Sequence, residues 1–183
     1  IDNEIGLTKS LDPTHRLLGG KLRGMEVRTS LLPDDHLQQH FAIFASKMSG
    51  HELGRRVQRL LEMETYRVLT LMGLEASRAK QGELVGLEKE LDALVLSMTG
   101  MRAEGGGNRK LIDRFSKLAT EMNALRTATR FRFSASRAYY NLAVQRLASL
   151  DEMPSGDLQT ISGFVRARLD PAIATINSFE DRL

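Results

Sequence analysis

The sequence contains no cysteine and no tryptophan among its 183 residues. Without cysteine the chain can form neither a disulfide framework nor a thiolate site, which fits a reducing compartment. Aromatic residues make up only 5% of the chain, so the core must be built from aliphatic side chains and methionine. Hydrophobic residues make up 42% and charged residues 27%, with a net charge of +3, which is an ordinary soluble, helix-rich composition.

The sequence also has no apolar run of the roughly eighteen residues that a membrane-spanning helix needs, and no signal peptide. It begins with Ile1 and ends at Leu183 within a helical pattern that has no cap. We therefore expect a part of a longer protein, with any membrane segment outside this chain. Its length predicts one domain with a small appendage: an N-terminal segment 1–48, which could belong to a truncated α/β region, and a helical part 49–183.

The longest helical pattern runs from Asn108 to Leu150 without proline or glycine. A helix of about forty residues would be roughly 60 Å long and must lie against an equally long partner. Apolar residues recur through it at helical spacing: Leu111, Phe115, Leu118, Met122, Leu125, Phe133, Tyr140, Val144 and Leu147.

The segment 49–103 is the predicted partner of this helix. Ser49 and Glu52 form a capping box that opens a helix to about Met72. Its predicted buried stripe is Leu53, Val57, Leu60, Leu61, Val68 and Leu71. Gly73 either ends this helix or bends it. From about Glu75 to Ala103 the leucines and methionines follow an a/d heptad pattern, typical of a coiled-coil seam: Leu84, Leu87, Leu91, Leu94, Met98 and Met101.

Gly105–Gly107 predicts the tip of an antiparallel helical hairpin, since glycine continues a helix poorly. Residues 109–130 should then lie against 82–103, and residues 131–150 against 62–81. The outgoing arm is acidic near the tip and the returning helix is basic. Exposed ion pairs contribute only about 0–1 kcal/mol each, so their predicted effect is on pairing direction and register.

The N-terminal segment predicts a small β element. Residues 22–32 alternate like a strand, and residues 40–46 predict a returning strand, with a short helix over 35–47 as the competing interpretation. Gly19-Gly20 predicts a break. A lone hairpin is marginally stable, so it should pack on the helices or belong to a larger sheet outside the chain.

The C-terminal part predicts two shorter helices. Asp151 to Gly156 predicts a break, Ser155 or Asp157 a helix cap, and Pro171 the first turn of a further helix. The predicted fold is therefore mainly α: a long, coiled-coil-like antiparallel helical hairpin with shorter C-terminal helices and a small N-terminal β element.

Few residues suggest chemistry. His36 and His40, beside Asp34 and Asp35, could bind a metal, but no third ligand follows at a recognisable spacing. Glu62, Glu64, Tyr66 and Arg67 could form a polar cluster with Arg137 or Arg146, for which a structural role is the better interpretation. The sequence thus predicts no catalytic residue, no metal and no cofactor.

One basic and aromatic stretch predicts an interaction surface. It lies in residues 126–140, with Arg126, Arg130, Arg137 and Tyr139 as the candidate residues. The three arginines fall on one helical face while Phe133 and Tyr140 lie on another, which disfavours binding to nucleic acid. Anionic lipid headgroups or an acidic partner are the alternatives.

The stretches Gly54–Arg67, Phe131–Tyr140 and Leu158–Ile173 resemble signature segments of an uncharacterised bacterial family of predicted membrane-anchored proteins, a domain of unknown function. The resemblance implies hydrophobic segments beyond Leu183, so that this chain would face the cytoplasm at the bacterial inner membrane. It supplies no catalytic or ligand residues. The general plan is similar to magnesium/cobalt channels, although their Gly-Met-Asn motif is missing from this chain.

These observations favour a non-enzymatic structural, oligomerisation or interaction module of a membrane-anchored protein. Leucine and methionine seams on a two-helix hairpin predict a homo-oligomer, since a further helix would cover them. The alternatives are the cytoplasmic part of an ion channel or transporter, and a module that binds anionic lipid or nucleic acid through its arginine-rich helix.

Overall fold

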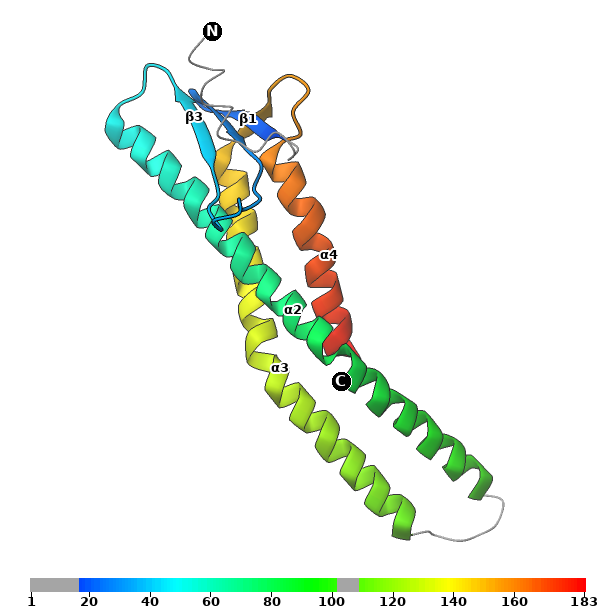
Figure 1. Ribbon diagram of the computed structural model, residues 1–183. Helices are drawn as coiled ribbons and strands as arrows, with labels where there is room; N and C mark the ends of the chain where they lie inside the picture. The colour runs from blue at the N-terminus through cyan, green and yellow to red at the C-terminus, as the bar shows by residue number, and fades with distance from the viewer. Residues whose placement is uncertain (1–16, 102–108) are drawn as a thin grey trace. The chain divides into compact units, whose positions relative to one another are not determined.

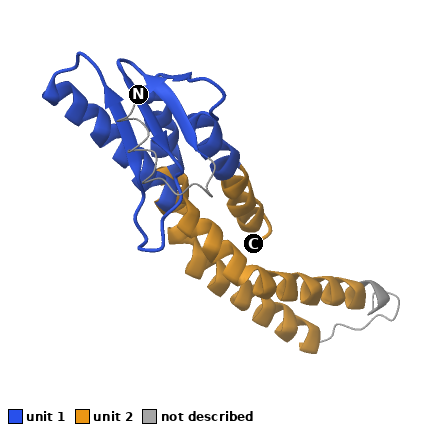
Figure 2. Ribbon diagram, turned by 45° about the horizontal axis from the view of Figure 1, so that its top comes forward, with its two compact units in different colours: residues 1–68, 140–170 blue, residues 69–139, 171–183 orange. Residues whose placement is uncertain are grey.

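The computed structural model describes residues 17–101 and 109–183. These residues form three helices and a four-stranded sheet (Figure 1). The chain divides into two compact units, which are coloured separately in Figure 2: unit 1 is residues 1–68 and 140–170, and unit 2 is residues 69–139 and 171–183. The predicted tip at Gly105–Gly107 lies outside the described residues.

Helix α2 spans Gly50–Met101 without interruption. Its start confirms Ser49 as the N-cap, because the Glu52 N–H donates to Ser49 Oγ at 3.2 Å and the Leu53 N–H donates to the Ser49 carbonyl at 3.0 Å. The Glu52 carboxylate accepts from Arg56 Nη2 at 2.8 Å. The sequence left open whether Gly73 ends the helix or bends it. The first alternative is wrong, because α2 continues past Gly73 to Met101. Gly73 is buried inside the helix, where packing overrides its low helix propensity.

Helix α3 spans Arg109–Leu150 and pairs with α2 in the predicted antiparallel sense. In unit 1, Arg146 Nε lies 2.6 Å from Glu62 Oε2. In unit 2, Arg114 Nη2 lies 3.8 Å from Glu90 Oε1. Both pairs fall within the predicted segments, so the antiparallel pairing of these segments is confirmed, although the partners Glu90 and Glu62 lie eight and four residues from the positions that the predicted register sets opposite Arg114 and Arg146.

The seam of the hairpin in unit 2 is confirmed for its leucines, whereas Met98 is 41% exposed. Leu84, Leu87 and Leu94 of α2 are buried with Leu118, Leu125 and Phe133 of α3 in one cluster. The last helix closes part of this cluster, because the Phe179 ring meets the Phe133 ring edge-on with centroids 5.3 Å apart. The seam that was predicted to require another chain is thus largely covered within this one.

The sheet is antiparallel, with the strand order β3-β2-β1-β4. Its strands are β1 (Leu18–Leu22), β2 (Met25–Thr29), β3 (Phe41–Ala45) and β4 (Glu152–Pro154). The β2–β3 pairing confirms the predicted hairpin and excludes the competing short helix. The larger sheet that the hairpin needs is completed by β1 and β4 from this chain.

One predicted break is wrong, because Gly19 and Gly20 lie in a strand. Gly19 and Gly20 lie in β1, where their missing side chains allow close approach. A Cβ on Gly19 would lie 2.6 Å from the Val27 carbonyl oxygen, and one on Gly20 would lie 2.6 Å from Glu152 Cγ. The predicted break at 151–156 is confirmed, because α3 ends at Leu150, and the short strand β4 lies within it.

Glu152 lies beside Gly20 because its carboxylate caps the last helix. Its two oxygens accept hydrogen bonds from the N–H groups of Ile161 and Ser162, at 2.7 and 2.8 Å. Thr160 Oγ1 accepts from the Gly163 N–H at 3.1 Å. A carboxylate and a threonine together therefore satisfy free donors at the helix N-terminus.

The last helix, α4, spans Ile161–Asp181 as a single element. The prediction of two C-terminal helices is therefore wrong, and so are Ser155 and Asp157 as caps, since Thr160 holds that position. Pro171 lies inside α4. Pro171 and Ala167 are exposed, so the carbonyl that loses its helical partner lies on the solvent side, while neighbouring Leu169 and Ala172 are buried.

The buried stripe predicted for the first half of α2 is partly wrong. Leu60 is buried, but Leu61 and Val68 are 51% and 46% exposed. The buried side of α2 carries Met63, Glu64, Arg67 and Thr70 instead. Three of these four residues are polar, so the apolar pattern identified the wrong side of this part of the helix.

Candidate interaction surfaces

The four candidate residues on α3 have different environments. Arg126 and Arg130 are exposed, whereas Arg137 and Tyr139 are half-buried. The Arg137 guanidinium donates to the Glu180 carboxylate of α4 within unit 2. Arg137 therefore has a structural partner, and the part of the predicted surface with free access to solvent is Arg126 and Arg130.

Ion pairs brace the helices of unit 2 against one another. Arg182, next to the end of α4, donates from Nε and Nη2 to the two oxygens of Glu88 on α2, at 2.7 and 2.5 Å. This bidentate pairing lowers the pKa of Glu88 and raises that of Arg182. Together with Arg137–Glu180 it joins α4 to both arms of the hairpin.

In unit 1 the predicted polar cluster separates into two pairs. Glu62 accepts from Gln58 Nε2 at 2.9 Å and from Arg146 Nε at 2.6 Å, and these bonds hold its pKa below the ordinary value. Glu64 instead pairs with Arg67 on the same helix. The two carboxylates are thus each bound to an arginine, an arrangement that supports a structural role.

The Glu64–Arg67 pair is buried. The two residues are 7% and 8% exposed, and Arg67 Nε and Nη2 each lie 2.6 Å from a Glu64 oxygen. Arg67 Nη2 also donates to the Leu31 carbonyl, at 3.4 Å. Leu31 has a positive φ of 51°, so this arginine fixes the loop that follows β2 onto α2.

His36 and His40 lie in the loop between β2 and β3, and His40 Nε2 lies 2.8 Å from Asp34 Oδ2. The other Asp34 oxygen accepts from the N–H groups of His36 and Gln38, both at 2.9 Å. No group of three or more metal-ligating residues occurs within residues 17–101 and 109–183. Asp34 thus organises the loop.

This loop should respond to acid. The hydrogen bond from His40, followed by the Gln38 N–H, lowers the pKa of Asp34 from 3.8 to about 2. Because the folded-state pKa is depressed, the stabilisation is present above pH 3.8 and is lost as the pH falls towards 2. Urea unfolding should show the wild type more stable than Asp34→Asn near neutral pH, with the difference shrinking across this window. A difference independent of pH would contradict the prediction.

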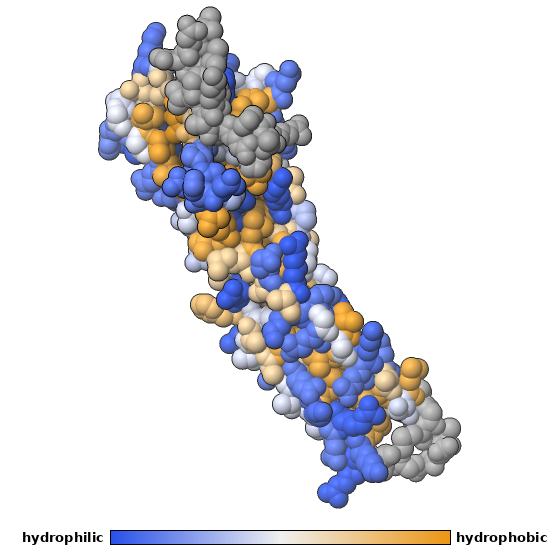
Figure 3. All heavy atoms as spheres, in the orientation of Figure 1, coloured by the Kyte–Doolittle hydropathy of each residue, from blue (hydrophilic) through white to orange (hydrophobic). Residues whose placement is uncertain are grey.

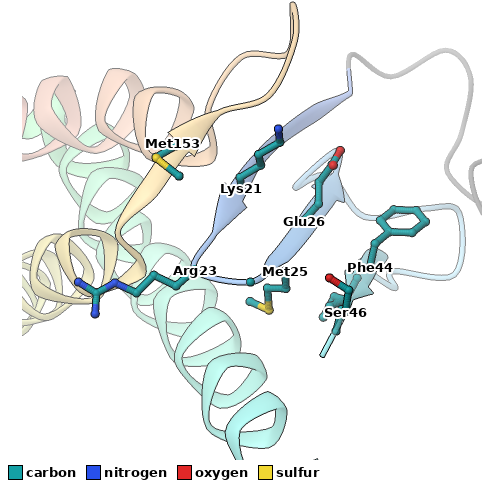
Figure 4. A pocket seen from close by; sticks show the side chains of 10 residues that line it. Lys21, Arg23, Met25, Glu26, Phe44, Ser46 and Met153 are labelled. Atoms are coloured by element: carbon teal, nitrogen blue, oxygen red, sulfur yellow. The ribbon is translucent and has the colours of Figure 1, made fainter. Parts of the chain in front are cut away.

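The outer face of the sheet carries a shallow hollow with a cavity volume of about 620 Å³. Lys21, Glu26, Phe44 and Met153 come from the four different strands and line it (Figure 4). Arg28 lies over the Phe44 ring, 5.1 Å from its centroid. Charges of both signs and apolar groups mix here, so the lining favours no single class of ligand.

The first half of α2 has an exposed apolar face that the sequence prediction missed. A hollow of about 450 Å³ lies along it, lined by Gly54, Val57, Gln58, Leu61, Glu62, Thr65 and Tyr66. Elsewhere, apolar side chains lie among hydrophilic ones on the surface drawn in Figure 3. The sequence alone does not reveal this face, because Leu61 and Val68 fit a buried stripe there. Their exposure follows only from the burial of the polar side of the helix.

Residues 15–183 match the family model described as a protein of unknown function (DUF3422). The chain belongs to this family. The predicted membership of an uncharacterised family is thus confirmed. Searches of curated proteins and of solved structures give no significant match.

The DUF3422 match covers the sheet as well as all three helices. The family description assigns no activity and no site. Among the helices of the described residues, none has the length and apolarity to cross a membrane.

Proposed function

We propose that this chain is a non-enzymatic, self-associating interaction module of a bacterial membrane-anchored protein. The observation that carries the proposal is the exposure of large apolar side chains on helices that are firmly braced. Exposed apolar side chains that lie together in one patch mark interaction sites. On these helices they include Leu61, Val68 and Met72 on α2, with Ile112 and Phe131 on α3.

Ion pairs between the helices favour a rigid arrangement of the exposed apolar side chains. Within unit 2 the bidentate Arg182–Glu88 pair and the Arg137–Glu180 pair fix α4 to the hairpin. Within unit 1 the Arg146–Glu62 pair links α3 to α2. A preorganised surface loses little conformational entropy when it binds, which favours association.

Membrane anchoring and a cytoplasmic orientation are the remaining parts of the proposal. Their support is the resemblance of Gly54–Arg67, Phe131–Tyr140 and Leu158–Ile173 to proteins predicted to be membrane-anchored. Binding to anionic lipid is the alternative, and for it Arg126 and Arg130 are exposed. Arg137 supports it less, because its guanidinium is paired with Glu180. The first interpretation is therefore preferred.

Light scattering tests self-association directly. The chain should show a rising average mass between about 1 and about 100 µM, the range in which a modest interface is populated. A monomer mass over the whole range would contradict the proposal.

A further inference from the structure

The sheet of unit 1 has two edge strands with different properties. The strand order leaves β4 at one edge and β3 at the other. Strand β4 has only three residues and ends at Pro154, and both features commonly protect an edge from pairing with another strand. Strand β3 has five residues, Phe-Ala-Ile-Phe-Ala. It contains no proline and no charge, so its sequence carries none of the residues that usually protect an edge strand.

The hydrogen bonds of the sheet show which backbone groups of β3 point outward. The Gly19 N–H donates to the Gln159 carbonyl at 3.0 Å, on the side of β1 away from β2. Successive residues of an antiparallel strand point their N–H and C=O groups alternately towards and away from a neighbour. Arg28, which lies opposite Gly19, therefore bonds to β3 with Ala42 as its partner. The residues of β3 whose backbone groups point away from β2 are then Phe41, Ile43 and Ala45.

A second contact agrees with this assignment. Thr29 Oγ1 donates to the His40 carbonyl at 2.8 Å, so the backbone of His40 faces β2. By alternation Ala42 and Phe44 face β2 as well, which again leaves the other three residues of β3 pointing outward.

The outward groups of β3 are accessible. Ala45 is exposed, and Phe41 and Ile43 are half-buried. Among residues 17–101 and 109–183, no hydrogen bond involves the outward N–H and C=O groups of these three residues. A row of unpaired donors and acceptors along a strand is a template for another extended strand.

We propose that β3 pairs with β3 of a second copy of the chain, antiparallel and centred on Ile43, so that one continuous sheet forms from the four strands of each copy. The inference rests on the proposed self-association and names a surface that performs it. Ile43 is the middle one of the three outward residues, so this centre uses all of them. The pairing is isologous, with each contact repeated about a two-fold axis.

The side chains of β3 are complementary to themselves in this register. Phe41 of each copy lies opposite Ala45 of the other, and Ala42 lies opposite Phe44, so a large side chain meets a small one on both faces of the sheet. Ile43 meets its own copy at the axis. A pairing centred on Ala42 would instead set two large side chains, Phe41 and Ile43, opposite each other.

Charge is also compatible with this register. Lys47, two residues beyond β3, lies opposite Gln39 of the other copy. His40 lies opposite Ser46 of the other copy and is already paired with Asp34 in its own chain. Like charges directly opposite each other destabilise a sheet, and this register places none along β3 or at its ends.

The substitution Ala45→Lys tests the edge. Ala45 is exposed, so the fold should be retained, while the lysine would occupy the space that Phe41 of the other copy needs. The dimer dissociation constant should rise by about 10-fold or more, as measured by analytical ultracentrifugation.

Met153→Lys is the matched control, because Met153 is 59% exposed on β4, at the opposite edge of the same sheet. It should leave the dissociation constant unchanged. Thermal unfolding followed by circular dichroism checks that both variants fold.

Disulfide crosslinking tests the register, and the absence of native cysteine makes it specific. The two Ile43 Cα atoms would lie about 5.5 Å apart, within reach of a disulfide, so Ile43→Cys should form covalent dimers on oxidation. A mixture of Phe41→Cys and Ala45→Cys proteins should form them more readily than either protein alone. The Ala45 residues of the two copies would lie about 13 Å apart along the strands, so Ala45→Cys alone should crosslink poorly.

The outcomes separate the edge from the function. Self-association that is insensitive to Ala45→Lys, or a folded Ile43→Cys protein that forms no crosslink, would overturn the pairing through β3 and leave the proposed function standing. Efficient crosslinking of Ala45→Cys alone would overturn the register centred on Ile43. A wild type that stays monomeric would overturn the pairing and the proposed function together.

Discussion

The substitution Glu64→Ala should lower the free energy of unfolding by about 3–5 kcal/mol, the usual cost of removing one partner of a buried ion pair. The Arg67 guanidinium is 8% exposed and would keep only its long contact with the Leu31 carbonyl. A buried positive charge would then have no counter-ion. Urea unfolding followed by circular dichroism measures the loss.

The double variant Glu64→Met with Arg67→Met is the matched control. It removes both charges and replaces them with apolar side chains of similar length, so it should be close to neutral or even more stable than the wild type. If the double variant loses as much stability as Glu64→Ala, the pair contributes a specific structural interaction and the explanation by an unpaired charge is wrong.

The substitution Gly73→Ala should destabilise the chain by about 1–3 kcal/mol, the usual cost of overpacking. The added methyl group would lie 2.7 Å from Ser136 Cβ and 2.9 Å from Ile176 Cδ1. Helix propensity acts in the opposite direction and favours alanine by about 1 kcal/mol. The clash should win because α3 and α4 contribute atoms from two sides, and thermal unfolding measures the net effect.

The substitution Gly82→Ala provides the internal reference for Gly73→Ala. Gly82 lies on the same helix in the same unit, and a Cβ there would meet nothing within 4 Å. It should therefore show the propensity gain alone and raise stability slightly. Equal effects of the two substitutions would show that α2, α3 and α4 do not approach closely at Gly73.

Local patterns predicted much of this fold because their causes are local. The Ser49 cap, the glycine-free run from 108 to 150 and the leucine heptads from Leu84 to Leu94 act through neighbours along the chain. The antiparallel pairing followed from the glycines at 105–107, with support from the placement of acidic and basic residues, and is confirmed by Arg146–Glu62. The strands β2 and β3 followed from alternation.

Three features could not be predicted from such local patterns, because each depends on how the side chains pack in the folded chain. Gly19 and Gly20 look like a break until Val27 and Glu152 are placed against them. Pro171 looks like a helix start until the buried neighbours Leu169 and Ala172 hold α4 together. The interaction surface was predicted on α3, while the exposed apolar stripe of unit 1 lies on α2.

The sequence by itself determined a mainly helical chain, its hairpin, its β element and its membership of a family of unknown function. Only the tertiary structure decided which side of α2 faces inward. The physical reason is the Glu64–Arg67 pair, because a carboxylate and a guanidinium that satisfy each other can be buried where an apolar stripe was expected. The burial of that polar side leaves Leu61 and Val68 exposed to solvent.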